Sequence, residues 1–214
     1  MIKNNKIPIA LEGLKLIIPL AVLTIVLFLL EWIIAGFISL AIALFMLFFF
    51  RDPRRVIPQG DDLVVAPADG KVVVVKDVHD NDYLHQDVKQ ISIFLSVFNV
   101  HVNRAPVGGI IESVKYNPGK FHIAALEKAS LENEQTAMII KDGNRKILVK
   151  QIAGILARRI ICYVQPGHVV KKGERYGLIC FGSRADIFLP VNSEIKVKLD
   201  DKVKGGKDII AVLK

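Results

Sequence analysis

The hydrophobic pattern divides the chain into two unlike parts. From Leu16 to Phe50 nearly every position is apolar, and Glu31 is the main interruption. Such a run is typical of membrane-spanning helix. As one helix it would extend about 50 Å, whereas the hydrocarbon core of a bilayer is roughly 30 Å thick. We therefore predict two helices, over about Lys15–Leu30 and Ile33–Phe50, that form a transmembrane or re-entrant hairpin. A single long tilted helix is the alternative.

The charges on either side of the apolar run predict its orientation. Lys3 and Lys6 precede the run, and Arg51, Arg54 and Arg55 follow it. Because positive flanks tend to stay in the cytoplasm, we expect both ends of the hairpin on that side of the cell membrane. The predicted domains are an anchor over residues 1–55 and a cytoplasmic domain over residues 56–214.

Beyond residue 55 the pattern changes to short apolar runs separated by turn residues, which is typical of β-strands. We predict a mainly β, barrel-sandwich-like domain with a few short helices, at about Ile123–Asn133 and Ala153–Arg159. The predicted strands are Leu63–Ala66, Lys71–Lys76, Gln90–Val97, Gly109–Tyr116, Thr136–Lys141, Lys146–Ile152, Leu178–Phe181, Ala185–Leu189 and Glu194–Leu199. Turns are expected at residues 69–70, 142–144 and 172–173, where Asp, Asn and Gly tolerate positive φ.

Charge and cysteine content narrow the function classes. The 214 residues carry a formal charge of +8, of which residues 1–50 contribute +1 and the rest of the chain +7. In a membrane-tethered protein this charge favours anionic lipid headgroups over nucleic acid, since no aromatic residues interleave with the basic ones. The two cysteines, Cys162 and Cys180, form no CxxC motif and have no histidine cluster beside them. We therefore predict no metal site and no disulfide framework, and expect both thiols to be buried.

Three separate segments contain candidate catalytic residues. They are PADG at 67–70, FNVHVNRAP at 98–106 and GSRAD at 182–186. A serine hydroxyl becomes a nucleophile when a base takes its proton, and a histidine held by a carboxylate is the common arrangement. Ser183, His101 and Asp69 provide these three groups. Gly182, which has no Cβ, permits strained backbone and close approach at the carbonyl that Ser183 would attack. A Gly-Ser pair alone is a weak motif that also fits a tight bend between strands.

Together these segments resemble the phosphatidylserine decarboxylase family, especially its short form, which includes archaetidylserine decarboxylase-like proteins. The resemblance extends through residues 116–121, 128–134 and 151–159, and so covers nearly everything from Arg51 onward. It implies a self-cleaving proenzyme, cut between Gly182 and Ser183 into chains 1–182 and 183–214. His122 and Cys180 depart from the family pattern, and Cys180 lies close enough to Ser183 to leave the local substrate contacts open.

The resemblance also implies the reaction. Loss of carbon dioxide from an amino acid leaves a carbanion that needs an electron sink. The family uses a pyruvoyl group, here made from Ser183, so no external cofactor is expected. His101 would then return a proton to the substrate. The substrate would be a membrane phospholipid with a serine headgroup, with either ester or ether chains, and Arg104 and Arg184 are the candidate phosphate ligands. The two fragments are expected to stay together as a heterodimer, and higher oligomers remain open.

Two other classes of function compete with this interpretation. Residues 67–72 and 166–174 also resemble hairpins of biotinyl or lipoyl carrier domains and of membrane-fusion adaptors, which are not catalysts. A carrier would display a lysine at a tight turn in an acidic or methionine-flanked context, and none is found. A serine protease or esterase is a weaker alternative because the sequence around Ser183 lacks the GxSxG form.

Overall fold

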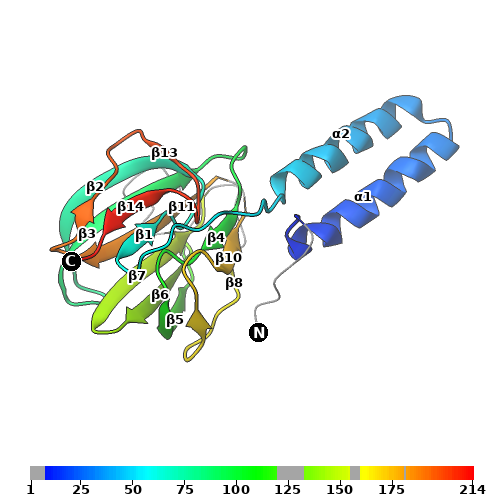
Figure 1. The fold of residues 1–214 in the computed structure, drawn as a ribbon. Coiled ribbons are helices and arrows are strands. Elements are labelled where there is room, and N and C mark those ends of the chain that lie inside the picture. Colours follow the sequence, from blue (N-terminus) through cyan, green and yellow to red (C-terminus); the bar gives the residue numbers. More distant parts are fainter. Residues whose placement is uncertain (1–7, 120–132, 155–159, 181) are drawn as a thin grey trace. The chain divides into compact units, whose positions relative to one another are not determined.

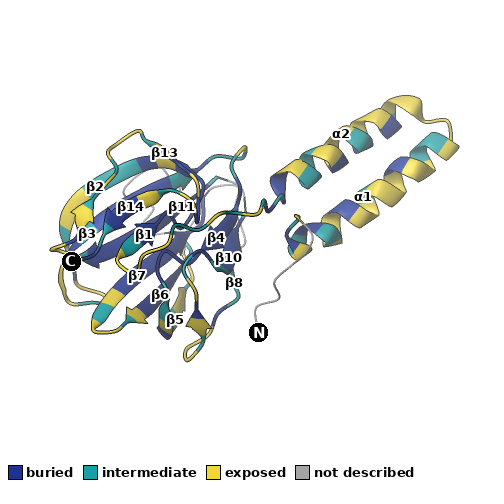
Figure 2. Cartoon of the chain, in the orientation of Figure 1, coloured by how far each residue is buried: buried dark blue, intermediate teal, exposed yellow. Residues whose placement is uncertain are grey.

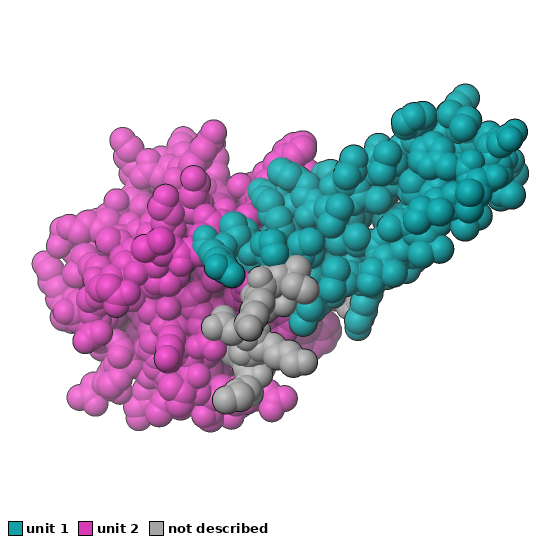
Figure 3. All heavy atoms as spheres, turned by 45° about the vertical axis from the view of Figure 1, so that its right-hand side comes forward, with its two compact units in different colours: residues 1, 3–54 teal, residues 2, 55–214 magenta. Residues whose placement is uncertain are grey.

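A computed structural model describes residues 8–119, 133–154, 160–180 and 182–214 of the chain. The chain divides between Arg54 and Arg55 into two compact units, coloured separately in Figure 3. The first unit is helical and the second is built from strands (Figure 1). This agrees with the predicted fold class, a mainly β domain preceded by a helical hairpin.

The first unit contains two apolar helices, α1 at Leu11–Leu29 and α2 at Ile33–Phe49. Glu31, in the turn between them, has a φ of 61°, which reverses the chain within three residues. The alternative of one long helix is therefore wrong. Helix α1 begins four residues before the predicted Lys15, so that lysine lies inside the helix. By length and composition α1 can cross a membrane, while α2 is shorter.

The two helices pack against each other through small and aromatic residues. Near the turn, the Phe28 and Phe37 rings meet edge to face with centroids 5.3 Å apart. In the middle, the hydroxyl oxygens of Thr24 and Ser39 are 2.8 Å apart and share a hydrogen bond. At the other end, the Ala10 N–H donates to the Phe50 carbonyl. The ends of the hairpin therefore meet, and most of the remaining apolar residues of the two helices are exposed or only partly buried (Figure 2).

The second unit contains fourteen strands within its described residues, and most coincide with short apolar runs of the sequence. The strands are β1 Leu63–Val65, β2 Gly70–Asp80, β3 Gln86–Leu95, β4 Val102–Arg104, β5 Gly109–Asn117, β6 Gln135–Asp142, β7 Arg145–Ile152, β8 Ile160–Cys162, β9 Val169–Val170, β10 Arg175–Ile179, β11 Ser183–Pro190, β12 Glu194–Ile195, β13 Lys202–Val203 and β14 Ile209–Val212.

These strands form one large sheet and two small ones, with every pairing antiparallel. The large sheet has the order β13-β2-β3-β11-β7-β6-β5-β9, so β11 lies in its middle. The small sheets are β1-β14-β12 and β4-β10-β8. Figure 1 shows the large sheet curling around the others. This arrangement places β11, which begins at Ser183, between β3 and β7.

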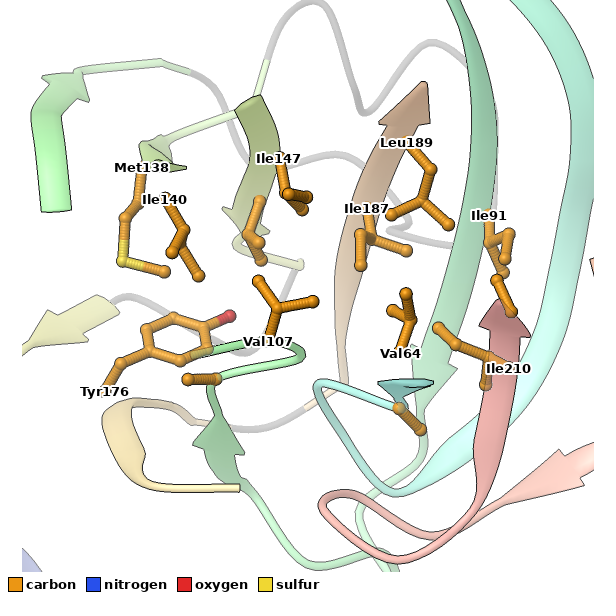
Figure 4. Packing of buried hydrophobic residues seen from close by; sticks show 14 of the residues in the cluster. Val64, Ile91, Val107, Met138, Ile140, Ile147, Tyr176, Ile187, Leu189 and Ile210 are labelled. Atoms are coloured by element: carbon orange, nitrogen blue, oxygen red, sulfur yellow. The ribbon is translucent and has the colours of Figure 1, made fainter. Parts of the chain in front are cut away.

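The main core lies between the large sheet and the two small sheets. Alternate residues of β3, β11, β7 and β6 point into it, among them Ile91, Ile187 and Ile147 (Figure 4). Val64 and Ile210 enter from one small sheet and Tyr176 from the other. Burial of these side chains, each worth roughly 1.5–3 kcal/mol, holds the sheets together. The opposite face of the large sheet carries a smaller apolar cluster that includes Val88, Leu148 and Phe188.

Some local predictions need correction. Glu194–Leu199 is a strand only at Glu194–Ile195, and the predicted Leu178–Phe181 strand spans Arg175–Ile179, with Phe181 outside the described residues. Most of the helix predicted at 123–133 and residues 155–159 of the other also lie outside them. Ala153 and Gly154 are described and are not helical. Cys162 and Cys180, predicted to be buried, are both partly exposed.

Candidate active site

Ser183 is the first residue of β11 and is fully buried. Its backbone pairs with Leu95 of β3. Its hydroxyl oxygen has no hydrogen-bond partner among the described residues, although buried polar atoms nearly always have one. Gly182, immediately before it, has a φ of 57°, a conformation that glycine adopts without strain. The Gly182–Ser183 bond therefore joins a left-handed glycine to a serine whose buried hydroxyl forms no hydrogen bond within the described part of the chain.

His101 is also fully buried and immediately precedes β4. Its carbonyl accepts a hydrogen bond of 3.2 Å from the Ile179 N–H. Ile179 is the last residue of β10, and Ser183 follows it by four residues. The backbone of the histidine segment is therefore attached to the strand that leads directly into the Gly182–Ser183 bond.

Asp69 lies in the connection between β1 and β2 and is almost completely buried. Nη2 of Arg55 contacts both of its carboxylate oxygens, at 3.0 Å and 2.8 Å. The Gly205 N–H donates to Oδ1 at 2.7 Å. Neither partner was predicted from the sequence, in which Arg55 was interpreted as a charge that flanks the apolar run.

Hydrogen bonds and packing contacts join the three motif segments in one region. The Arg104 N–H of the histidine segment donates to the carbonyl of Pro67 in the PADG segment, at 2.9 Å. Ala68 packs with Leu95 of β3 and Ala185 of β11, one alternate position beyond Ser183. The fold thus brings PADG, VHVNR and GSR together, as their proposed joint chemistry requires. The individual roles of Ser183, His101 and Asp69 remain predictions.

The two candidate phosphate ligands lie in different surroundings. Arg104 is mostly buried, and its Nη1 donates to the carbonyl of Gly173 at 3.1 Å. Arg184 is fully buried, and strand alternation directs it to the face of β11 opposite Ser183. Its Nη2 donates to Asp186 Oδ2 at 3.0 Å, and its Nε lies 2.8 Å from Oδ1. Headgroup binding stays a prediction for both arginines, and Arg184 already pairs with a carboxylate.

A pair of buried amides near Ser183 was not predicted. Gln151 of β7 donates from Nε2 to Oδ1 of Asn103 at 2.8 Å. Gln151 is paired with Ala185, so its side chain lies on the same face of the sheet as Ser183. Within the described ranges, Asn103 Nδ2 and Gln151 Oε1 have no hydrogen-bond partner. The signal in the sequence was their position inside VHVNR and QIAG, two of the segments that carried the family resemblance.

The opposite face of β11 contains a second polar group. Lys150 of β7 is paired with Asp186 and is almost fully buried. Its ammonium lies 4.7 Å from the centre of the Tyr83 ring and 5.1 Å from that of Phe188. Burial lowers the pKa of Lys150, and the charges of Asp80 and Asp186 oppose that shift only in part. This face therefore contains buried charged groups as well as the apolar cluster, and two aromatic rings lie near the Lys150 ammonium.

Comparison with known proteins identifies the class of this protein. The sequence profile described as phosphatidylserine decarboxylase matches residues 42–211. The phosphatidylserine decarboxylase proenzyme of Syntrophotalea carbinolica is 44% identical over 213 residues, which cover 99% of this chain and 100% of the relative. That of Geotalea uraniireducens is 42% identical over 99% of both chains. That of Ehrlichia chaffeensis is 49% identical over 83% of this chain and 80% of the relative.

These matches define a decarboxylase that is made as a proenzyme. The chain belongs to the phosphatidylserine decarboxylase family, as the motif segments predicted. The family assignment and the enzyme class are thereby confirmed, and the carrier, adaptor and protease alternatives are not supported. A lipid-directed family and an apolar α1 also support association with a membrane.

Proposed function

We propose that this chain cuts itself between Gly182 and Ser183, converts Ser183 into a pyruvoyl group and then decarboxylates phosphatidylserine to phosphatidylethanolamine. The family assignment supports the reaction, since the relatives are proenzymes of this activity. The observation that carries the site is the buried Ser183 hydroxyl, which has no hydrogen-bond partner in the described part of the chain and follows a glycine at positive φ. An ether-linked lipid with the same headgroup is the alternative substrate.

In the proposed cleavage, the Ser183 oxygen attacks the Gly182 carbonyl carbon and His101 accepts the hydroxyl proton. The peptide C–N bond breaks, so Gly182 becomes an ester of the Ser183 side chain and the serine nitrogen becomes a free amine. Removal of the Ser183 α-proton then expels the Gly182 carboxylate and leaves a dehydroalanine. Water replaces the nitrogen after tautomerisation, which releases ammonia and leaves a keto acid at the new N-terminus. No oxidant or reductant is required.

Ser183 would become a pyruvoyl group at a buried position. A pyruvoyl carbonyl supplies the electron sink that decarboxylation of an amino acid needs. The chain's own residues would do the rest. His101, as its imidazolium, would deliver a proton to the substrate α-carbon, while Asp69 keeps the imidazole oriented. Arg104 is the preferred phosphate ligand, because a guanidinium matches phosphate oxygens with two parallel donors.

The sheet supports a product of two chains that stay together. Residues 183–214 would contain β11, β12, β13 and β14. All eight residues of β11 pair with β3, and five of them pair with β7. Strands β13 and β14 add pairings to β2 and β1. We therefore propose a heterodimer of fragments 1–182 and 183–214 at the cell membrane, with its catalytic domain in the cytoplasm. Higher oligomers remain an open part of the proposal.

Mass spectrometry of the purified full-length chain tests the proposal. The wild type should contain a fragment of residues 183–214 whose N-terminus is blocked to Edman sequencing and reacts with carbonyl reagents. It should also release carbon dioxide from phosphatidylserine in mixed micelles. Ser183→Ala should remain one chain and be inactive. An intact wild-type chain that folds, binds lipid and never acquires a ketone would refute the proposal.

A further inference from the structure

Arg55 lies in the segment between α2 and β1 and extends into the candidate site. The side chains of Arg55 and Asp69 are 9% and 12% exposed, so their ion pair is largely shielded from water. Nη2 contacts both carboxylate oxygens, and Arg55 Nε is buried without a hydrogen-bond partner among the described residues. The carboxylate is therefore the group that holds this guanidinium in place.

The neighbouring arginines are placed differently. Arg51 donates from Nη1 to the Phe48 carbonyl at 2.7 Å, and its guanidinium lies 3.8 Å from the centre of the Phe48 ring. Arg51 thus contacts the end of α2. Arg54 is exposed to solvent. Of the three arginines that follow the apolar run, Arg55 is the one that, within the described ranges, forms an ion pair with a predicted catalytic residue.

The contacts of Asp69 leave it able to hold a further group. A carboxylate has about four acceptor positions. Arg55 uses two of them and the Gly205 N–H uses a third, so one position remains for a further donor. The proposed function gives that role to the imidazole N–H of His101. Arg55 and Gly205 approach from segments at opposite ends of the domain sequence. Together they fix the carboxylate in orientation as well as in charge.

We infer that Arg55 is a positioning residue for Asp69, and that the segment leaving the membrane anchor is in this way part of the self-cleavage apparatus. The inference rests on the proposed function, in which Asp69 orients His101. A buried carboxylate without a cation either takes up a proton or turns toward water. In both cases it would stop holding the imidazole in the orientation that accepts the Ser183 proton. Arg55 therefore acts on the rate at which the Gly182–Ser183 bond breaks.

The first test compares Arg55→Met, Arg55→Lys and Arg54→Met in the full-length chain. The appearance of fragment 183–214 is followed by mass spectrometry after synthesis in the presence of lipid. Loss of orientation in Arg55→Met should slow cleavage on the order of 10- to 100-fold. Arg55→Lys keeps the charge but not the planar guanidinium, so it should be intermediate. Arg54→Met, the matched control, should cleave within about twofold of wild type, as expected for an exposed side chain.

A double variant separates positioning from general destabilisation. If Arg55 acts through Asp69, Arg55→Met should slow Asp69→Asn no further, because the group that it positions is already disabled. A purely structural role would make the two slowdowns multiply. Multiplying effects, or an Arg55→Met chain that cleaves as fast as Arg54→Met, would overturn the inference. A wild-type chain that never cleaves would instead refute the proposed function.

Discussion

Ser183 and Arg184 are adjacent on β11 and equally buried, yet their side chains lie on opposite faces of the sheet. The two faces differ in how far their polar groups are hydrogen-bonded or paired. On the Ser183 face, a hydroxyl and two amide atoms lack hydrogen-bond partners among the described residues. On the Arg184 face, a guanidinium is paired with Asp186 and a buried ammonium lies over aromatic rings. Unsatisfied polar groups cost stability and are retained where chemistry uses them, whereas paired charges keep a position rigid. We interpret the first face as reactive and the second as supporting.

The comparison predicts that the largest effect, a slower self-cleavage, follows from removal of the base on the reactive face. His101→Gln should slow formation of fragment 183–214 by about 10²- to 10⁴-fold, the usual contribution of a general base. His79→Gln is the matched control, since His79 is exposed and pairs with Asp87 at the surface. Time courses by mass spectrometry measure both variants. Cleavage of His101→Gln at the control rate would remove the histidine from the mechanism.

On the supporting face, the expected effect is on stability. Arg184→Met leaves the Asp186 carboxylate buried without its cation, which should cost about 3–5 kcal/mol. Urea unfolding followed by circular dichroism measures this in a Ser183→Ala background, so that all samples remain uncut. The double variant Arg184→Met/Asp186→Leu should regain most of the loss. If Arg184→Met has the same free energy of unfolding as its Ser183→Ala parent, the ion pair does not stabilise the folded chain.

A smaller effect is expected for the amide pair on the reactive face. Gln151→Met removes the donor to Asn103 Oδ1 and leaves that buried oxygen without it, which should cost about 1–3 kcal/mol. The exposed Gln165→Met serves as control. Urea unfolding in the Ser183→Ala background measures the stability of both variants. Their cleavage rates in the wild-type background show whether the amide pair also affects self-cleavage. Equal stability of the two variants would contradict the assigned hydrogen bond.

The smallest expected effect is the contribution of Lys150 to the pH dependence of folding stability. Burial lowers its pKa in the folded chain, so between that value and about 10.4 the unfolded chain binds more protons than the folded one. Stability should therefore rise with pH in this window, by at most about 1.4 kcal/mol per pH unit from this residue. Lys150→Met should flatten that rise, while Lys146→Met, an exposed lysine of the same strand, should not. Unfolding midpoints at several alkaline pH values provide the measurement.

Local rules were sufficient for much of this architecture. The length of the apolar run ending at Phe50 predicted a helical hairpin, and short apolar runs between turn residues located strands such as Thr136–Lys141 within two residues of their observed bounds. Short strands such as Lys202–Val203 were missed because two residues carry no readable period. Their pairing partners, far away in the chain, decide that they are strands.

At the candidate site, too, the sequence indicated individual residues but not the contacts between distant ones. The residue order of PADG, VHVNR and GSR was enough to select Ser183, His101 and Asp69, because motifs report which chemical groups a site contains. It was not enough to assign Arg55 to Asp69, since the sequence pattern of that arginine fits a membrane-flanking charge equally well.

The amino-acid sequence by itself therefore determined the class of protein and the helical hairpin, and it predicted a set of reactive groups, because periodicity and motifs are local properties. Tertiary structure alone decided that Arg55 and Gly205 hold the Asp69 carboxylate. Hydrogen bonds and ion pairs form between atoms within about 3 Å, and only the folded chain brings residues as distant as 69 and 205 that close together.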